Sequence, residues 1–237
     1  MSDRHGSVGS MFECVFDIDP GAGESALRAQ VELFEQVKSK AAAAQARATA
    51  LWESRRRAAE TAAGVPAAKR GRGLASEVAL ARRDAPVKGN QHVGFATALV
   101  REMPHTLAAL EAGVLSEWRA TLVVKQSACL SVEHRRALDA ELCADPSRLQ
   151  GWGNRRVEAE AKKIAARLDV AAVVERNAKA AKDRCVTIRP APDTMTYVSA
   201  LLPVAQGVAV FAALKRAADS TFDERSRGQV MADELVA

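Results

Sequence analysis

The chain contains few aromatic residues, and its cysteines lack the spacing that is typical of disulfide frameworks or zinc knuckles. Phe, Trp and Tyr together make up 4% of its 237 residues, and Tyr197 is the sole tyrosine. An extended surface for stacking on single-stranded bases is therefore not expected. The four cysteines include no C-x-x-C pair, which argues against a zinc knuckle or a set of disulfides. We expect free thiols.

Long apolar runs are also missing. No stretch approaches the roughly 18 uninterrupted apolar residues of a membrane-spanning helix. Residues 1–10 are small and polar and lack the apolar segment of a secretory signal. These absences predict a cytoplasmic protein without a membrane partner.

Catalytic motifs are absent as well. The four histidines are isolated, and none has the spacing of a metal-ligand cluster with another histidine or a cysteine. The chain contains no G-x-S-x-G, no P-loop and no strand-preceded G-x-G-x-x-G. We therefore expect no metal, no cofactor and no catalytic residue, and we predict that the chain is not an enzyme by itself.

Alanine, the best helix former and a poor strand former, is abundant, and 48% of the residues are hydrophobic. Residues 24–63 contain neither Gly nor Pro, and Leu27, Val31 and Phe34 recur at helical spacing. This pattern predicts one long helix over residues 24–63, which ends at Gly64.

The sequence divides into a short lead-in and one helical domain. Residues 1–22 mix Gly, Ser, Asp and Pro without a period and should form a loosely ordered lead-in, whereas residues 23–237 should form a single helical domain. Its helical body spans 74–182. Turn and cap residues delimit shorter helices within this body, predicted at 74–83, 90–103, 104–112, 116–128, 132–144 and 154–168.

The pattern changes after Lys182. Period-two alternation on both sides of the turn-like residues 190–194 predicts a small β-hairpin near residues 184–199. Pro203 then opens an amphipathic helix, and a last short helix covers residues 229–236. No residue after that helix caps or buries it, so the sequence looks truncated. The fold class is mainly α: a multi-helix bundle with a long N-terminal helix and one hairpin.

The charge balance favours an anionic partner. Lys plus Arg number 34 against 29 for Asp plus Glu, which gives a net charge of +5. Residues 74–83 and 90–103, joined by a short turn, have the layout of a helix-turn-helix, with Lys88, Asn90 and Gln91 suited to phosphates and bases. An ordinary αα-hairpin in a bundle has the same appearance.

A second pair of helices gives a similar pattern. Ala109, Gly113 and Ser116 match the spacing of a tight helix-turn-helix crossing, but Arg119 takes a position where an apolar residue is expected. A corner of the bundle is the favoured interpretation there. The candidate DNA contacts of the whole chain are Lys69, Arg70, Arg72, Arg82, Arg83, Lys88, Asn90, Gln91 and Arg119.

Three segments carry a resemblance to a known family: residues 70–83 (RGRGLASEVALARR), 103–121 (MPHTLAALEAGVLSEWRAT) and 189–195 (RPAPDTM). Over roughly residues 24–237 the chain resembles the domain of unknown function 222 family, whose members typically stand upstream of an HNH nuclease domain. An HNH site needs a histidine base and a divalent metal. No histidine here matches that motif, so the resemblance brings no catalytic residue.

Our main hypothesis from the sequence is a non-catalytic accessory module that binds or positions DNA. The alternative is a protein-interaction or oligomerisation module, in which the long helix 24–63 pairs with another chain or the C-terminal helix docks on an HNH nuclease domain. A truncated remnant of an HNH nuclease without activity is the third interpretation.

Overall fold

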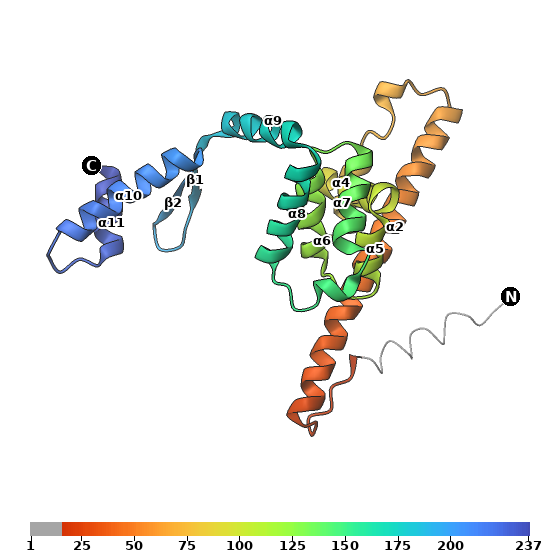
Figure 1. Cartoon of the computed structure of the whole chain (residues 1–237), viewed down its shortest axis with the longest axis horizontal. Coiled ribbons are helices and arrows are strands. Elements are labelled where there is room, and N and C mark those ends of the chain that lie inside the picture. The colour runs from red at the N-terminus through yellow and green to blue at the C-terminus, as the bar shows by residue number, and fades with distance from the viewer. Residues whose placement is uncertain (1–15) are drawn as a thin grey trace. The chain divides into compact units, whose positions relative to one another are not determined.

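The computed structural model describes residues 16–237 and is mainly α-helical with one β-hairpin, which confirms the predicted fold class (Figure 1). The chain divides into two compact units, with the boundary between Asp169 and Val170. The sequence predicts a single domain over residues 23–237. That these units unfold together as one domain stays a prediction.

The expected lead-in is described only in part, because residues 1–15 lie outside the described residues. Residues 17–23 form neither helix nor strand. The ring of Phe16 stacks on the ring of Phe34, with 5.5 Å between their centroids, so the start of the described chain contacts the long helix.

The long helix, α2 (Glu24–Ala62), ends one residue before the predicted position. Gly64 follows it at a φ of 72°, and the amides of Gly64 and Val65 donate to the carbonyls of Thr61 and Glu60. This is the paired hydrogen bonding of a Schellman cap, in which the left-handed position favours glycine.

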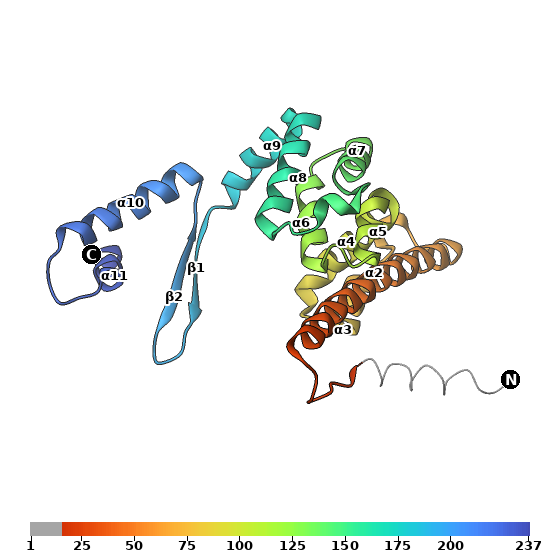
Figure 2. The ribbon, with the colours of Figure 1, turned by 60° about the horizontal axis from the view of Figure 1, so that its bottom comes forward.

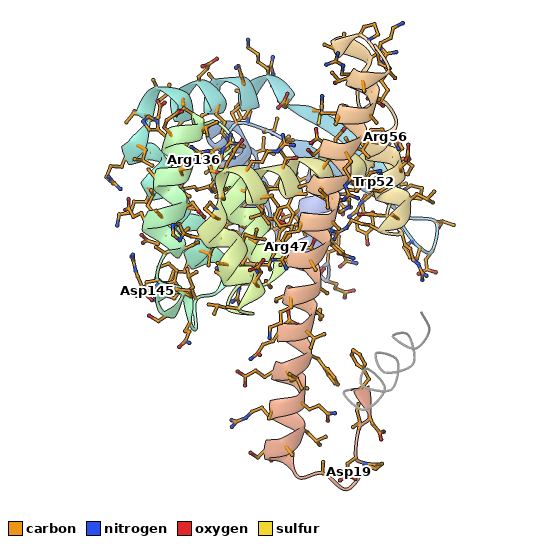
Figure 3. All side chains as sticks on the ribbon, turned by 90° about the vertical axis from the view of Figure 1, so that its right-hand side faces the viewer. Asp19, Arg47, Trp52, Arg56, Arg136 and Asp145 are labelled. Atoms are coloured by element: carbon orange, nitrogen blue, oxygen red, sulfur yellow. The ribbon has the colours of Figure 1, made fainter. Side chains whose placement is uncertain are left out.

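Only the middle of α2 is buried, through small side chains that let other helices approach closely, among them Ala43 and Ala46. Both ends of α2 extend past the bundle (Figures 1 and 3). Ion pairs hold it in place: Arg56 donates to both carboxylate oxygens of Glu77 at 3.1 and 2.7 Å, and Arg47 pairs with Glu111. Figure 3 shows Arg47 and Arg56 on the part of α2 that crosses the bundle.

The next helices form the bundle, and each agrees with its predicted range to within two residues at either end. The short 3-10 helices η1 (Ala67–Lys69), η2 (Pro86–Lys88) and η3 (Pro146–Leu149) lie between them. The helices are α3 (Leu74–Ala81), α4 (Gly89–Glu102), α5 (Pro104–Glu111), α6 (Glu117–Ser127), α7 (Val132–Cys143) and α8 (Asn154–Leu168).

Helix α4 is the centre of this unit and contacts α2, α3, α5, α6 and α7. Its Leu99 is fully buried, as are Leu110 of α5 and Leu138 of α7. The crossing of α3 and α4 is so close that a Cβ at Gly89 would lie 1.9 Å from the carbonyl oxygen of Ala75. Glycine is therefore required at Gly89 by packing.

A buried carboxylate holds the start of α5. Asp139 of α7 is fully buried and accepts from the amides of His105 and Thr106 at 2.8 and 2.7 Å, and from the Thr106 hydroxyl at 2.6 Å. It caps the helix from another element, where the anion also suits the N-terminal end of the helix dipole. The adjacent thiol of Cys143 is buried, and burial raises its pKa to about 11.

The second unit contains α9 (Val170–Ala180), the 3-10 helix η4 (Ala181–Asp183), the two strands, α10 (Val204–Ser220) and α11 (Arg227–Val236). Strands β1 (Cys185–Pro190) and β2 (Thr196–Leu201) pair antiparallel, which confirms the predicted hairpin (Figure 2). Helix α11 begins two residues before the predicted position, because Ser226 and Gln229 form a capping box.

The second unit buries little. Val230 is the one residue between 170 and 237 that is buried. On one face of the hairpin, Val186, Ile188 and Val198 are between 58 and 72% exposed. None of the helices described between residues 16 and 237 is long and apolar enough to cross a bilayer.

Candidate nucleic-acid interface

The turn between α3 and α4 positions the candidate residues. Arg83 takes a left-handed φ of 55°, and the amides of Arg83 and Asp84 donate to the carbonyls of Leu80 and Ala79. This arrangement is again a Schellman cap, here with arginine in the position that glycine usually takes. Pro86 then starts η2, and the chain enters α4 directly after Lys88.

A pocket of about 460 Å³ lies between this turn and helix α6. It brings together three of the predicted residues, Arg82, Lys88 and Gln91. We call it the lysine pocket. Its full lining is Arg82, Asp84, Lys88, Gln91, His92, Phe95, Glu117, Trp118, Thr121 and Lys125.

An ion pair and a hydrogen bond fix the walls of the lysine pocket. Arg82 donates to Glu117 at 2.6 Å and is mostly buried. His92 and Asp84 lie 2.9 Å apart, and this hydrogen bond, more than any other contact, lowers the pKa of Asp84. These contacts hold the turn against α6 and α4.

The two lysines of the pocket, Lys88 and Lys125, lie in surroundings different from those of Arg82. Lys88 is exposed, and the ammonium of Lys125 lies 5.2 Å from the ring centroid of Trp118. Trp118 itself is 53% exposed. With Arg82 the pocket holds three cations against the carboxylates of Asp84 and Glu117, which leaves one positive charge in excess.

The other predicted residues do not line this pocket. Arg83 and Asn90 are exposed on the same turn and helix, and Lys69 and Arg72 are exposed on the segment before α3. Arg70 is half-buried, and its Nε donates to the carbonyl of Val65 at 2.8 Å. The candidates from residues 69–72 therefore form a group separate from the pocket residues.

The second helix-turn-helix candidate is a packed corner. A Cβ at Gly113 would lie 2.9 Å from Cγ of Gln36 on α2, and the Nε of Arg119 lies 3.3 Å from Oδ1 of Asn154. Arg119 is half-buried and links α6 to α8 instead of facing the lysine pocket. That Arg119 contacts DNA stays a prediction. Its contact with Asn154 fits the interpretation of this segment as a corner of the bundle.

The central place of α4 limits how it could meet DNA. A recognition helix lies in the major groove and contacts bases mainly through its N-terminal residues. Five helices surround α4, but its first turn is open, because Asn90 and Gln91 are exposed. This first turn is the part of α4 that a duplex could reach beside the lysine pocket.

Two residues of the lysine pocket, Trp118 and Lys125, are not among the candidates predicted from the sequence. They stand seven residues apart on α6 and therefore share a face of that helix, which is a signal the sequence contains. That this face borders the α3–α4 turn depends on packing between distant segments. Among the described residues 16–237, no cluster of His, Cys, Asp and Glu side chains is arranged to hold a metal ion; the prediction that the chain is not an enzyme stays a prediction.

Comparison with known proteins gives one finding. Neither a curated protein nor a solved structure matches the chain. The family model described as "Domain of unknown function (DUF222)" matches residues 35–237. This range covers most of the sequence and includes all of the candidate residues, so the chain belongs to the DUF222 family, as its resemblance predicted.

Proposed function

We propose that the chain is a non-catalytic module that binds DNA through phosphate contacts at the lysine pocket and the adjoining first turn of α4. The observation that supports this most is the meeting of Lys88, Lys125 and Gln91, from two helical segments, around one open pocket. Lysines act as point charges toward phosphate, and a glutamine amide can pair with an adenine edge.

The carboxylates of the pocket limit the strength of this binding. Asp84 and Glu117 are held by His92 and Arg82, but their charge still opposes a phosphate. We therefore expect few phosphate contacts, about three, and a slope of about −3 when the logarithm of the affinity is plotted against that of the salt concentration.

The test is fluorescence anisotropy of labelled duplex DNA, titrated at roughly 50 and 200 mM salt. Saturable binding that weakens with salt supports the proposal. Absence of binding at the lower concentration contradicts it, and so does binding that salt leaves unchanged.

Variants locate the contacts. Lys88→Gln and Lys125→Gln should each weaken binding and flatten the salt slope by about one unit. Lys163→Gln is the matched control: Lys163 is 77% exposed on α8 and does not line the pocket, so the same change of charge there should leave the slope nearly unaltered. Equal effects in all three variants would indicate a diffuse attraction instead of a site.

The wider role that we propose is to position DNA for an HNH nuclease domain. It rests on the resemblance described above, in which such domains stand upstream of a nuclease. Its test is the cleavage of DNA by such a domain in the presence of this chain and of its Lys88→Gln variant. A rate that is the same with both proteins would contradict it.

A second candidate function is association with another protein, and exposed apolar residues favour it. On α2, Val31 is 69% exposed and Leu33 44%, and the hairpin of the second unit presents Ile188 at 72%. Light scattering over a wide range of protein concentration is the test, because self-association depends on concentration. A constant monomer mass would exclude self-association.

A further inference from the structure

A second pocket, of about 480 Å³, lies on a different face of α4. Helix α2 supplies Glu53 and Arg57, and α7 supplies Arg135. We call it the arginine pocket. Its lining is Glu53, Arg57, Val93, Gly94, Thr97, Ala98, Arg101, Glu102 and Arg135.

The charges of the arginine pocket are organised around a buried carboxylate. Glu53 is 5% exposed and accepts from the guanidinium groups of both Arg57 and Arg101, the latter at 2.5 Å. Arg135 pairs with Glu102. Three guanidinium groups therefore face two carboxylates, and one positive charge is in excess.

The three arginines of this pocket differ in how many of their N–H donors are already used in hydrogen bonds. Arg135 is 18% exposed and also donates to the carbonyls of Ser127 and Leu130, each at 3.3 Å, so its donors are used in holding the end of α6. Arg57 and Arg101 are 53 and 48% exposed. A guanidinium has five N–H donors, and Glu53 engages one edge of each, which leaves donors for a ligand.

Gly94, which lines the arginine pocket, also indicates a ligand there. Glycine in a helix interior weakens the helix, and packing explains it at Gly89, where a Cβ would collide with the carbonyl of Ala75. At Gly94 a Cβ would meet no atom within 4 Å. Packing therefore does not require this glycine, whereas the close approach of a ligand to the helix backbone would.

We propose that the arginine pocket binds a small ligand through a phosphate group, held between Arg57 and Arg101 above Gly94. Arginine suits this task because its planar fork matches the oxygens of phosphate. Thr97, one turn after Gly94, lines the same pocket. The volume lies within the range of small-molecule sites, about 300–1,000 Å³.

Inorganic phosphate is the probe. In a titration at constant ionic strength, followed by amide NMR, the signals of Gly94 and Thr97 should shift saturably, with a dissociation constant of about 1 mM. Arg101→Gln should weaken binding at least about tenfold, as expected when a charge-assisted hydrogen bond is lost. Shifts that stay linear, or that spread over all cationic surfaces, would overturn the proposal.

Gly94→Leu separates binding from folding. Leucine is a far better helix former, and no atom occupies the space of its Cβ, so the melting temperature should stay the same or rise while the larger side chain blocks the pocket. The saturable shift should vanish. Lys163→Gln is the control: Lys163 is 77% exposed on α8 and lines neither pocket, so this change should leave phosphate binding unchanged. Undiminished binding by Gly94→Leu would refute the site.

Duplex DNA distinguishes a free ligand from a nucleic-acid backbone. Gly94→Leu should keep the DNA affinity of the unmodified chain, whereas Lys88→Gln should lower it. If duplex DNA shifts the Gly94 signal and inorganic phosphate does not, the pocket is a backbone contact and the proposal of a small ligand is wrong. The two proposals therefore fail in different experiments.

Discussion

The unit that ends at Asp169 and the unit that begins at Val170 differ in how much apolar surface they bury. The first has fully buried residues in α4, α5, α6, α7 and α8, whereas the second buries Val230 alone. Their local structure forms equally well, because helix caps and strand alternation act within short stretches of chain. Regular secondary structure therefore does not by itself indicate a core, and this difference in burial between the units can be measured.

The largest expected effect is in the first unit. Replacing the buried Asp139 by Ala removes the acceptor of two amides and one hydroxyl and should lower the free energy of unfolding by about 3 kcal/mol or more. Urea unfolding measures this. The matched change Asp183→Ala, at an exposed residue of the second unit, should cost less than about 0.5 kcal/mol. Similar losses in both variants would contradict the burial of Asp139.

A pair of valines tests the contrast with one chemical change. Val157 of α8 is fully buried, and Val186 of β1 is 70% exposed. Truncation to Ala should cost about 2 kcal/mol at Val157 and less than about 0.5 at Val186. A large loss at Val186 would mean that a partner covers the hairpin face in solution, and would favour the protein-association function.

Part of this fold was predictable from the sequence, and the reason differs from residue to residue. The long helix was predicted to within one residue, because no Gly or Pro interrupts it and Gly64 ends it. The cap that Asp139 places on Thr106 joins residues 33 positions apart, and no local pattern records it. In the same way, Lys88 and Gln91 were predicted as candidates, but their meeting with Lys125 depends on how α6 packs.

The cysteines predict a difference in pH dependence. Burial raises the pKa of Cys143 from 9.0 to about 11, so folding favours the protonated thiol. The stabilisation is complete below the unfolded pKa and is lost as pH rises toward 11. At pH 10 the free energy of unfolding should have fallen by about 1 kcal/mol from this group alone.

The measurement is chemical unfolding at pH 8 and pH 10 with the unmodified chain and Cys143→Ala. The loss that belongs to Cys143 is the part that the variant no longer shows. Iodoacetamide gives the comparison between the units, since the exposed Cys185 of β1 should react in the folded protein and Cys143 only after unfolding. Equal rates at both thiols would show that Cys143 is accessible.

The smallest expected effect is in the turn of the hairpin. Asp193 and Thr194 take left-handed φ values of 59 and 61°, and the amide of Met195 donates to the carbonyl of Pro192 at 3.2 Å. This geometry is that of a type I′ turn, which Asp-Gly favours and a β-branched residue disfavours. Thr194→Gly should therefore stabilise the hairpin by up to about 1 kcal/mol.

The measurement is amide hydrogen exchange. Exchange should become slower in β1 and β2 of the Thr194→Gly variant and stay unchanged in α4. If exchange also slows in α4, the two units open together and form one cooperative domain, as the sequence predicts for residues 23–237.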